Sequence, residues 1–452
     1  MKQAVTATWM RGGTSKCWVF EKSALQVPGY TTDEVLLRLF GSPDSRQIDG
    51  VGGGSSTTSK AVILEPSQEP GIDVEYTFAE VGIDQAVVDW GSNCGNCSAV
   101  IAPYALKRGW VQAKDQFVTV HIRNTNTGQL LVEQMNLDGS ESSALIPGVP
   151  LTAQGVEIGF LDPAGATTGK LFPDRNETST LSIHGDTSEQ VQATLIDAGA
   201  PIVIIDAQSA RLEGIEFSHW LTESLDEMPR LDRIRRAGAV AMGLADSPAQ
   251  AERAIPKLAI VQAADTQNHN DLLVMMLSMG APHPALAITG SIGLTLAAQH
   301  QGTVLAKLLK QTPGEFLKLQ TPAGQITTWQ RQIDGTMVVG TTRTARVLAE
   351  STLSFDPIST EHGEPTVTHL ELPDASEDQL LPDPEPHRRR TVFASVTAFA
   401  VLGLGATLVG GGLLNPPATT ADGDYSGKPL RWSFHWPKVE APIPGPDLSA
   451  KN

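Results

Sequence analysis

Lys60 ends a loop whose residue types suit the binding of an anion and the transfer of a proton. The loop, residues 52–60, runs from glycines into serines and threonines, so it offers backbone N–H groups and hydroxyls before the amine. It lacks the Gly-Lys-Ser/Thr ending of a P-loop and does not match the GxGxxG dinucleotide fingerprint. The apolar run Ala61–Leu64 follows. Burial beside that run would lower the pKa of Lys60 towards the range of a general base; the alternative is an ordinary surface lysine.

Cys94 lies in a tight turn, Asn93–Asn96, directly before an expected helix, and three interpretations of it stay open. With Cys97 it forms a Cys-x-x-Cys pair that is typical of redox dithiols, although no thioredoxin-like βα pattern surrounds it. A zinc site needs two further ligands, and the chain has no second Cys-x-x-Cys pair. In the third interpretation, the amides and the dipole at a helix start lower the pKa of the Cys94 thiol and make it an acid/base group.

Two further turns carry groups that recognise carboxylates. Residues 11–15, Arg-Gly-Gly-Thr-Ser, follow an expected strand and combine a guanidinium, two hydroxyls and free backbone N–H groups. A plain strand–turn–strand connection is the alternative there. The second turn holds His283 between two prolines, and a lone histidine is more often structural than catalytic.

The elements that must position these residues indicate an α+β fold. Segments rich in β-branched or aromatic residues predict strands at Val5–Met10, Cys17–Phe20, Val74–Phe78, Phe117–Ile122, Leu130–Gln134, Gln192–Ile196 and Ile202–Ile205. Helices are predicted at Thr32–Phe40, Cys97–Lys107, Leu231–Met242, Asp271–Ser278 and Leu286–Gln299. Asn126–Gly128 predicts a hairpin turn. Because strands outnumber helices and do not alternate regularly with them, α+β is favoured over a doubly wound α/β fold.

Length and composition restrict the class of protein. The chain has 452 residues, which predicts two or three units, and we expect two domains at residues 1–185 and 186–356. Its 50 acidic residues against 33 basic ones give a net charge of −17, which argues against binding to nucleic acid. Three cysteines are too few for a disulfide framework. We therefore expect the body of the protein in the cytoplasm.

The residues after 356 predict a linker (357–390), a membrane helix (391–415) and a tail (416–452). Pro357–His387 holds eight acidic residues and six prolines without Lys or Arg, which indicates an extended linker. Val392–Leu414 is 23 residues without a charge. As a helix it would be about 34 Å long and would cross a hydrocarbon core of ~30 Å, attaching the protein to a membrane. Arg388–Arg390 would keep the body on the cytoplasmic side. A merely Gly/Ala-rich segment is the alternative.

Taken together, these motifs resemble the PrpF-like 2-methylaconitate cis–trans isomerase family, which has a diaminopimelate epimerase-like fold. The matching stretches run in order from about residue 5 to 355 and include Met10–Lys16, Gln47–Gly50, Gly52–Lys60, Val88–Trp90, Asn93–Asn96, Gly169–Pro173, Ala198–Pro201, Pro256–Lys257, Asp271–Leu273, Leu277–Gly280 and Arg343–Arg346. The resemblance implies an α+β protein of two pseudo-equivalent halves. Each half would be a barrel-like sheet around a central helix, with the site in the cleft between them.

The resemblance also implies a reaction. Members of the family shift a proton or a double bond in small unsaturated polycarboxylates without a metal or an organic cofactor, and fixed donors stabilise the dienolate. The resemblance makes Lys60 and Cys94 the acid/base candidates and leaves open which of them removes the proton. The candidates for binding the substrate carboxylates are Arg11, Gly12, Gly13, Thr14, Ser15, Ser55, Ser56, Thr57, Ser59, Asn93, Gly95, Asn96 and His283.

Several alternatives stay open at this point. The favoured activity is isomerisation of a 2-methylaconitate-like tricarboxylate. The alternative activities within the same chemistry are those of a 4-oxalomesaconate tautomerase and an aconitate isomerase. An inactive carboxylate-binding module tethered at a membrane is the alternative from another class, and a homodimer is one assembly that we consider. Asp174–Asn176 and Thr321–Gly324 depart from the family pattern, and Cys97 could trap Cys94 in a disulfide. These departures leave the particular substrate open.

Overall fold

The computed structural model describes residues 3–91, 93–138, 143–183, 189–264, 270–278 and 280–356, all of which belong to one compact unit. The strands of its first half are β1 (Gln3–Gly12), β2 (Ser15–Glu21), β3 (Lys60–Pro66), β4 (Val74–Val81), β5 (Val88–Asp89), β6 (Phe117–Asn124), β7 (Leu130–Asn136), β8 (Ser143–Ala144) and β9 (Ala153–Leu161). Those of its second half are β10 (Ser179–Ile183), β11 (Glu189–Ala198), β12 (Ala200–Asp206), β13 (Lys257–Ala263), β14 (Leu272–Ser278), β15 (Ala281–Pro282), β16 (Phe316–Thr321), β17 (Gly324–Ile333) and β18 (Thr336–Phe355). The α-helices are α1 (Thr32–Phe40), α2 (Gly95–Ser98), α3 (Ile101–Arg108), α4 (Trp220–Ala241) and α5 (Ile288–Ala297).

The strands of the N-terminal half close into a barrel. The pairings run β1–β2–β3–β4–β6–β7–β9–β18, and β18 returns to β1. Apolar residues alternate along the strands, as in β6, where Val118, Val120 and Ile122 are buried and their neighbours are less so. These side chains pack in one core with Val100 and Ile101, where α3 begins. The barrel is therefore filled by the short helices α2 and α3.

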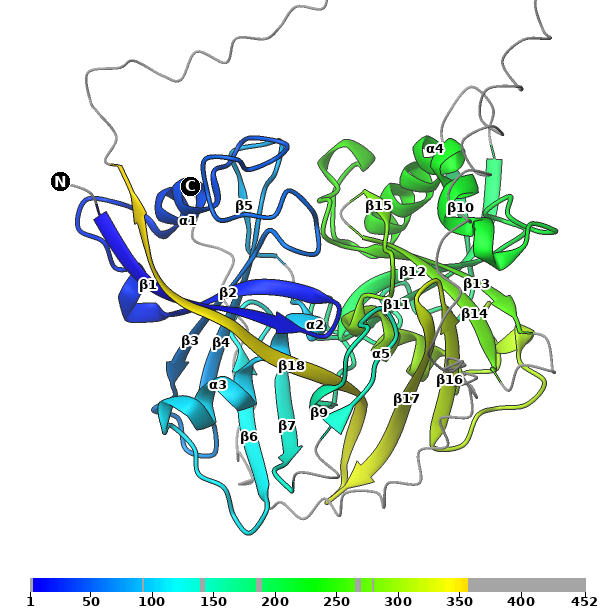
Figure 1. Ribbon diagram of the computed structural model, residues 1–452. Helices are drawn as coiled ribbons and strands as arrows, with labels where there is room; N and C mark the ends of the chain where they lie inside the picture. The colour runs from blue at the N-terminus through cyan, green and yellow to red at the C-terminus, as the bar shows by residue number, and fades with distance from the viewer. Residues whose placement is uncertain are drawn as a thin grey trace, which may run out of the picture. The chain divides into compact units, whose positions relative to one another are not determined.

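The C-terminal half repeats this arrangement around α5. Its pairings run β11–β12–β13–β14–β16–β17–β18–β9, and an isolated bridge from Ala164 to Ala198 leads back to β11. Every residue of α5 is buried, and the helix contacts β11, β12, β17 and β18 (Figure 1). The strands β9 and β18 thus take part in both rings.

The order of pairings shows an internal duplication. The parallel pair β2–β3 corresponds to β12–β13, the antiparallel pair β3–β4 to β13–β14, and the parallel pair β4–β6 to β14–β16. α1 follows β2 and α4 follows β12, and each packs on the outside of its sheet in a separate apolar cluster. Lys60 opens β3 and Lys257 opens β13, so equivalent positions of the two halves carry the same residue type.

The structure confirms the α+β class and corrects several predicted elements. The helix predicted at Thr32–Phe40 is α1, which a capping box between Thr31 and Glu34 starts, and the predicted hairpin turn joins β6 to β7. The prediction of a helix at Asp271–Ser278 is wrong, because this segment forms β14 between β13 and β15. The helix predicted at Leu231–Met242 starts earlier, at Trp220. The helix predicted at Cys97–Lys107 is divided into α2 and α3.

The linker, the membrane helix predicted at Val392–Leu414 and the tail lie outside the described residues. Within the described ranges, no helix has both the length and the apolar character needed to cross a bilayer. The boundary predicted at residue 185 stays a prediction.

Candidate active site

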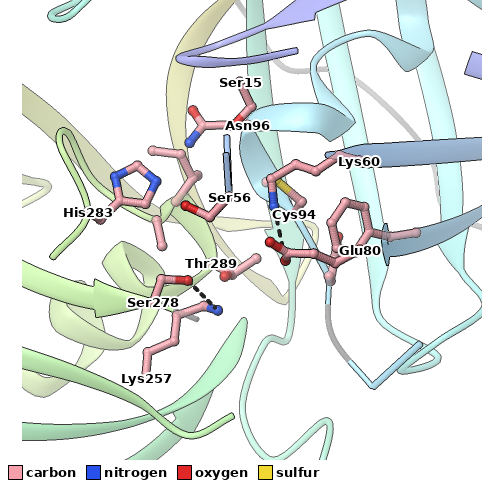
Figure 2. Close-up of a pocket in the computed structure, with 15 residues that line it drawn as sticks. Ser15, Ser56, Lys60, Glu80, Cys94, Asn96, Lys257, Ser278, His283 and Thr289 are labelled. Carbon is pink, nitrogen blue, oxygen red and sulfur yellow. Dashed lines mark hydrogen bonds and ion pairs between the residues drawn. The ribbon is translucent and has the colours of Figure 1, made fainter. Parts of the chain in front are cut away.

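Residues from both halves line one hollow of about 410 Å³, its open mouth included (Figure 2). The N-terminal half supplies Ser15, Ser56, Lys60, Phe78, Glu80, Asn93, Cys94, Gly95 and Asn96. The C-terminal half supplies Lys257, Ser278, His283, Ala287, Ile288 and Thr289. The hollow therefore lies where the first residues of β3 and β13 meet the turns before α2 and α5.

Lys60 is held as a cation by Glu80. The β3–β4 register places the two residues opposite each other, and Nζ lies 3.0 Å from Oε2 with both side chains less than a tenth exposed. The amine also lies 5.0 Å from the centre of the Phe78 ring. Burial is the largest single influence and lowers the pKa of Lys60, but the carboxylate of Glu80, together with the neighbouring Cys94 and Cys97, outweighs it and the pKa is raised. The expected lowering is thus wrong, because sequence alone does not reveal the counter-charge.

Cys94 holds its proton more tightly than the sequence predicts. It is the N-cap of α2, and its Sγ accepts a hydrogen bond from the backbone N–H of Cys97 at 3.4 Å. The side chain of Cys97 and burial raise the pKa of the thiol, and Lys60 opposes them only in part. Because α2 is a single turn, its dipole is too small to reverse this effect. All three cysteines are free thiols.

The turn around Cys94 needs glycines beside it. Asn96 donates from Nδ2 to the carbonyl of Leu286 at 3.1 Å and so connects α2 to the turn before α5. A Cβ on Gly12 would lie 2.4 Å from the carbonyl oxygen of Asn96, and a Cβ on Gly13, which has φ +52°, would meet the side chain of Asn96.

Asn93 is buried, and neither polar atom of its amide has a hydrogen-bond partner among the described residues. Its amide is therefore available to a ligand.

The C-terminal wall carries an amine and an imidazole. Lys257 is buried and donates from Nζ to the carbonyl of Ala254 at 3.2 Å and to Oγ of Ser278 at 3.5 Å. Burial lowers its pKa. His283 accepts a hydrogen bond at Nδ1 from the backbone N–H of Ala285, and burial together with the two lysines lowers its pKa to about 3. The ring is therefore neutral and carries its proton on Nε2.

The structure brings together part of the residue set predicted from the sequence. The predicted residues that line the hollow are Ser15, Ser56, Lys60, Asn93, Cys94, Gly95, Asn96 and His283. Those that do not line it are Arg11, Gly12, Gly13, Thr14, Ser55, Thr57 and Ser59.

Two residues of the second group, Arg11 and Ser59, form hydrogen bonds with neighbouring segments of the chain. Arg11 donates to the carbonyl of Thr344 at 3.0 Å and to its hydroxyl at 2.9 Å. Ser59 donates to the carbonyl of Val81 and accepts from the side chain of Gln47. The role of the second group in substrate binding stays a prediction.

Glu80, Lys257, Ser278 and Thr289 line the hollow although none of them was among the predicted site residues. The sequence carries a signal for Lys257 and Ser278, because both lie in stretches of the family resemblance, and Lys257 also precedes an apolar run, as Lys60 does. The departures at Asp174–Asn176 and Thr321–Gly324 do not line the hollow. In the described part of the chain, no three His, Cys, Asp or Glu side chains gather into a set that could hold a metal ion.

The comparisons with known proteins give one family. A family model described as PrpF protein matches residues 2–355. The chain is 36% identical over 346 residues to 4-oxalomesaconate tautomerase of Pseudomonas putida, covering 75% of this chain and 92% of the relative. It is 33% identical over 351 residues to 2-methyl-aconitate isomerase of Shewanella oneidensis, covering 71% and 88%. A crystal structure of methylitaconate-delta-isomerase is similar with a TM-score of 0.64 and 31% identity, covering 80% of this chain and all of that one.

Proposed function

Because the chain belongs to the PrpF protein family, we propose that it is a cofactor-independent isomerase that moves a proton and a double bond in an unsaturated polycarboxylate. The names of its relatives, a tautomerase and isomerases, support this reaction class. We also assign the two-barrel arrangement to the diaminopimelate epimerase-like fold. The repeated order of strand pairings in the two halves supports that assignment.

One observation carries the proposal: an ammonium, a thiol and an unpartnered amide line the same buried hollow. Lys60 and Cys94 both belong to it, and each influences the pKa of the other. A protein with net charge −17 repels a polycarboxylate at long range, so a local site must supply the attraction. Two lysines and one glutamate line the hollow, so basic side chains outnumber acidic ones there.

The reaction requires removal of a proton from a weakly acidic carbon and its return at the other end of an allylic system. Charge develops on the substrate carboxylate as the dienolate forms, and fixed donors lower the energy of that state. The Lys60 ammonium, fixed by Glu80, suits this role, and the Asn93 amide suits a second oxygen. The Cys94 thiol delivers a proton to the far carbon. Ser15, Ser56, Asn96 and His283 offer further donors to the remaining carboxylates.

We favour a 2-methylaconitate-like tricarboxylate as the substrate, with 4-oxalomesaconate and aconitate as alternatives. Relatives named for the first two are about equally similar to this chain.

Solvent deuterium incorporation tests the function. The purified full chain is incubated in heavy water with 2-methylaconitate, 4-oxalomesaconate or cis-aconitate, and the products are followed by NMR. We expect deuterium at the allylic carbon and a shifted double bond for one of these substrates. A catalytically inactive carboxylate-binding module would bind them without exchange, and this result would contradict the isomerase.

Two cysteine variants supply the control. Cys94→Ala should lose activity by about 10²-fold or more, because it removes the proton donor. Cys97 does not line the hollow, so Cys97→Ala should retain activity. If both variants lose activity equally and the wild-type protein turns over a dithiol substrate, the redox interpretation replaces the proton shift.

Membrane attachment through Val392–Leu414 and a homodimer also stay proposals. The 23 uncharged residues after Arg388–Arg390 support attachment with the body on the cytoplasmic side. The full chain should then sediment with membranes, and truncation after Asp356 should release it; a full chain that stays in the supernatant contradicts the attachment.

A further inference from the structure

Two lysines occupy equivalent positions in the two halves of the described unit. Lys60 opens β3 and Lys257 opens β13. Each of these strands pairs in parallel with the strand before it and antiparallel with the strand after it. Both side chains are buried and line the hollow, and Figure 2 shows them on opposite sides of it. The duplication therefore places one amine on each wall of the same site.

The two amines differ in the residue that faces them across the next strand. The β3–β4 register puts Glu80 opposite Lys60, and 3.0 Å separates its Oε2 from Nζ. The register of β13 and β14 puts Ser278 opposite Lys257 in the same way, with its Oγ 3.5 Å from Nζ. Serine has neither the length nor the charge of glutamate. Among the residues that the structure describes on the C-terminal wall, no carboxylate therefore takes the place that Glu80 has on the N-terminal wall.

Lys257 lies in the protein with neutral partners alone among its printed neighbours. Its Nζ donates to the carbonyl of Ala254 at 3.2 Å and to Oγ of Ser278. Across the ranges that the structure describes, no hydrogen bond or ion pair joins this amine to a carboxylate. The acidic residue of the lining, Glu80, is paired with Lys60. A buried ammonium without an opposite charge costs free energy, and a ligand carboxylate beside Nζ would remove that cost.

Two further groups on the same wall can donate to a carboxylate. The hydroxyl of Ser278 accepts from Nζ of Lys257, so its own proton is free for an anion. Nδ1 of His283 accepts the backbone N–H of Ala285, which leaves the proton of the ring on Nε2. Both residues line the hollow, and Figure 2 shows them on the side of Lys257. An ammonium, a hydroxyl and an imidazole N–H together suit a carboxylate.

On the basis of the isomerase function above, we propose that Lys257, Ser278 and His283 bind one carboxylate of the substrate. That carboxylate takes, on the C-terminal wall, the place that the carboxylate of Glu80 takes on the N-terminal wall. The proton shift stays with the groups of the N-terminal wall, and Lys257 anchors the other end of the substrate. The site then selects unsaturated di- and tricarboxylates, whose carboxylates reach both walls, over monocarboxylates.

Binding of tricarballylate tests the anchor without turnover, because this saturated tricarboxylate has no double bond to shift. Its dissociation constant for the full chain is measured by isothermal titration calorimetry. Lys257→Met removes the charge with little change in size and should weaken binding by about 10- to 10²-fold. Lys257→Arg keeps a positive charge and should bind within about tenfold of the wild type. The matched control is Lys318→Met, which changes an exposed lysine of β16 and should bind as the wild type does.

A pair of simpler ligands separates an anchor from a merely structural lysine. Glutarate and pentanoate have five carbons each and differ by one carboxylate. The wild type should prefer glutarate by about tenfold or more, because a second carboxylate reaches Lys257. In Lys257→Met this preference should fall to within about threefold, since pentanoate can place its one carboxylate at Lys60 in either protein. Thermal unfolding of each variant checks the fold.

Equal weakening of glutarate and pentanoate by Lys257→Met would overturn the proposal, because the lysine would then support the hollow as a whole. A wild-type protein that binds no tricarballylate, or an arginine variant that binds it no better than the methionine variant, would overturn it as well. The isomerase function fails separately: a wild-type protein that binds tricarballylate through Lys257 but exchanges no deuterium with the three substrates keeps the carboxylate site and loses the reaction.

Discussion

Glu133 is a carboxylate buried inside the N-terminal barrel. It is fully shielded from solvent, and its Oε2 accepts the backbone N–H of Ala102, in the first turn of α3, at 2.9 Å. Burial raises its pKa well above the ordinary value. Between the ordinary and the raised pKa, the group is protonated in the folded protein and ionised in the unfolded chain. Folding therefore takes up a proton, and the free energy of unfolding falls as the pH rises through this window.

We predict that Glu133→Gln removes this pH dependence. The amide oxygen of Gln can still accept the N–H of Ala102, and it never ionises. Stability of the wild type should fall by about 1.4 kcal/mol per pH unit within the window, so the variant gains stability relative to the wild type as the pH rises through that window. Chemical denaturation at a series of pH values measures it, with exposed Glu213→Gln as the control. A gain that does not change with pH contradicts the raised pKa.

Single motifs in the sequence identify residues that glycine-rich turns present, but not their partners. Lys60, Cys94 and His283 all lie in or beside such turns, and all three line the hollow. Glu80 lies inside a strand, and only the pairing of β3 with β4 brings its carboxylate to Lys60. The raised pKa values of Lys60 and Cys94 depend on contacts of this kind. The chemistry of the site is therefore predicted less well than its position.

At the scale of elements, β14 shows where local pattern fails. Its apolar run, Leu272–Leu277, has the length of a helical segment or of a fully buried strand, and periodicity alone does not separate the two. The segment forms a strand because β13 pairs with it along one edge and β15 and β16 pair with it along the other. By contrast, α1 carries its own capping box and a left-handed Gly41 at its end. Elements with local start and stop signals are the ones that sequence predicts well.

The contact between the β1–β2 hairpin and α2 gives a prediction at this scale. Gly12→Ala would place a Cβ 2.4 Å from the carbonyl oxygen of Asn96 and 2.9 Å from Cγ1 of Val100. The hairpin must then move away from the turn that holds Cys94. We expect a loss of about 1–3 kcal/mol in stability and a lower kcat. Gly314→Ala, where no heavy atom lies within 4 Å of the added Cβ, should change stability by less than about 0.5 kcal/mol. Equal stability of the two variants contradicts the close approach.

At the scale of the whole described unit, the duplication explains why the site needs both halves. Each half brings one lysine at the start of an equivalent strand, and the hollow combines them with the turns before α2 and α5. Sequence comparison within the chain does not reveal this, because Glu80 in one half corresponds to Ser278 in the other and Cys94 corresponds to Ala287, the other N-cap. The halves have kept their strand order and diverged where the chemistry lies.

The shared strand β18 gives a prediction for the boundary at residue 185. β18 pairs with β1 from Gly12 to Gln3 and with β9 over Val338–Ala345, so a fragment of residues 1–185 has two unpaired strand edges. We expect this fragment to aggregate or to unfold without a cooperative transition. Fusing residues 336–356 behind it through a Gly/Ser linker should restore both pairings and a cooperative transition in circular dichroism. If residues 1–185 unfold cooperatively without the fused strand, the first half is an independent domain that does not need β18 to fold.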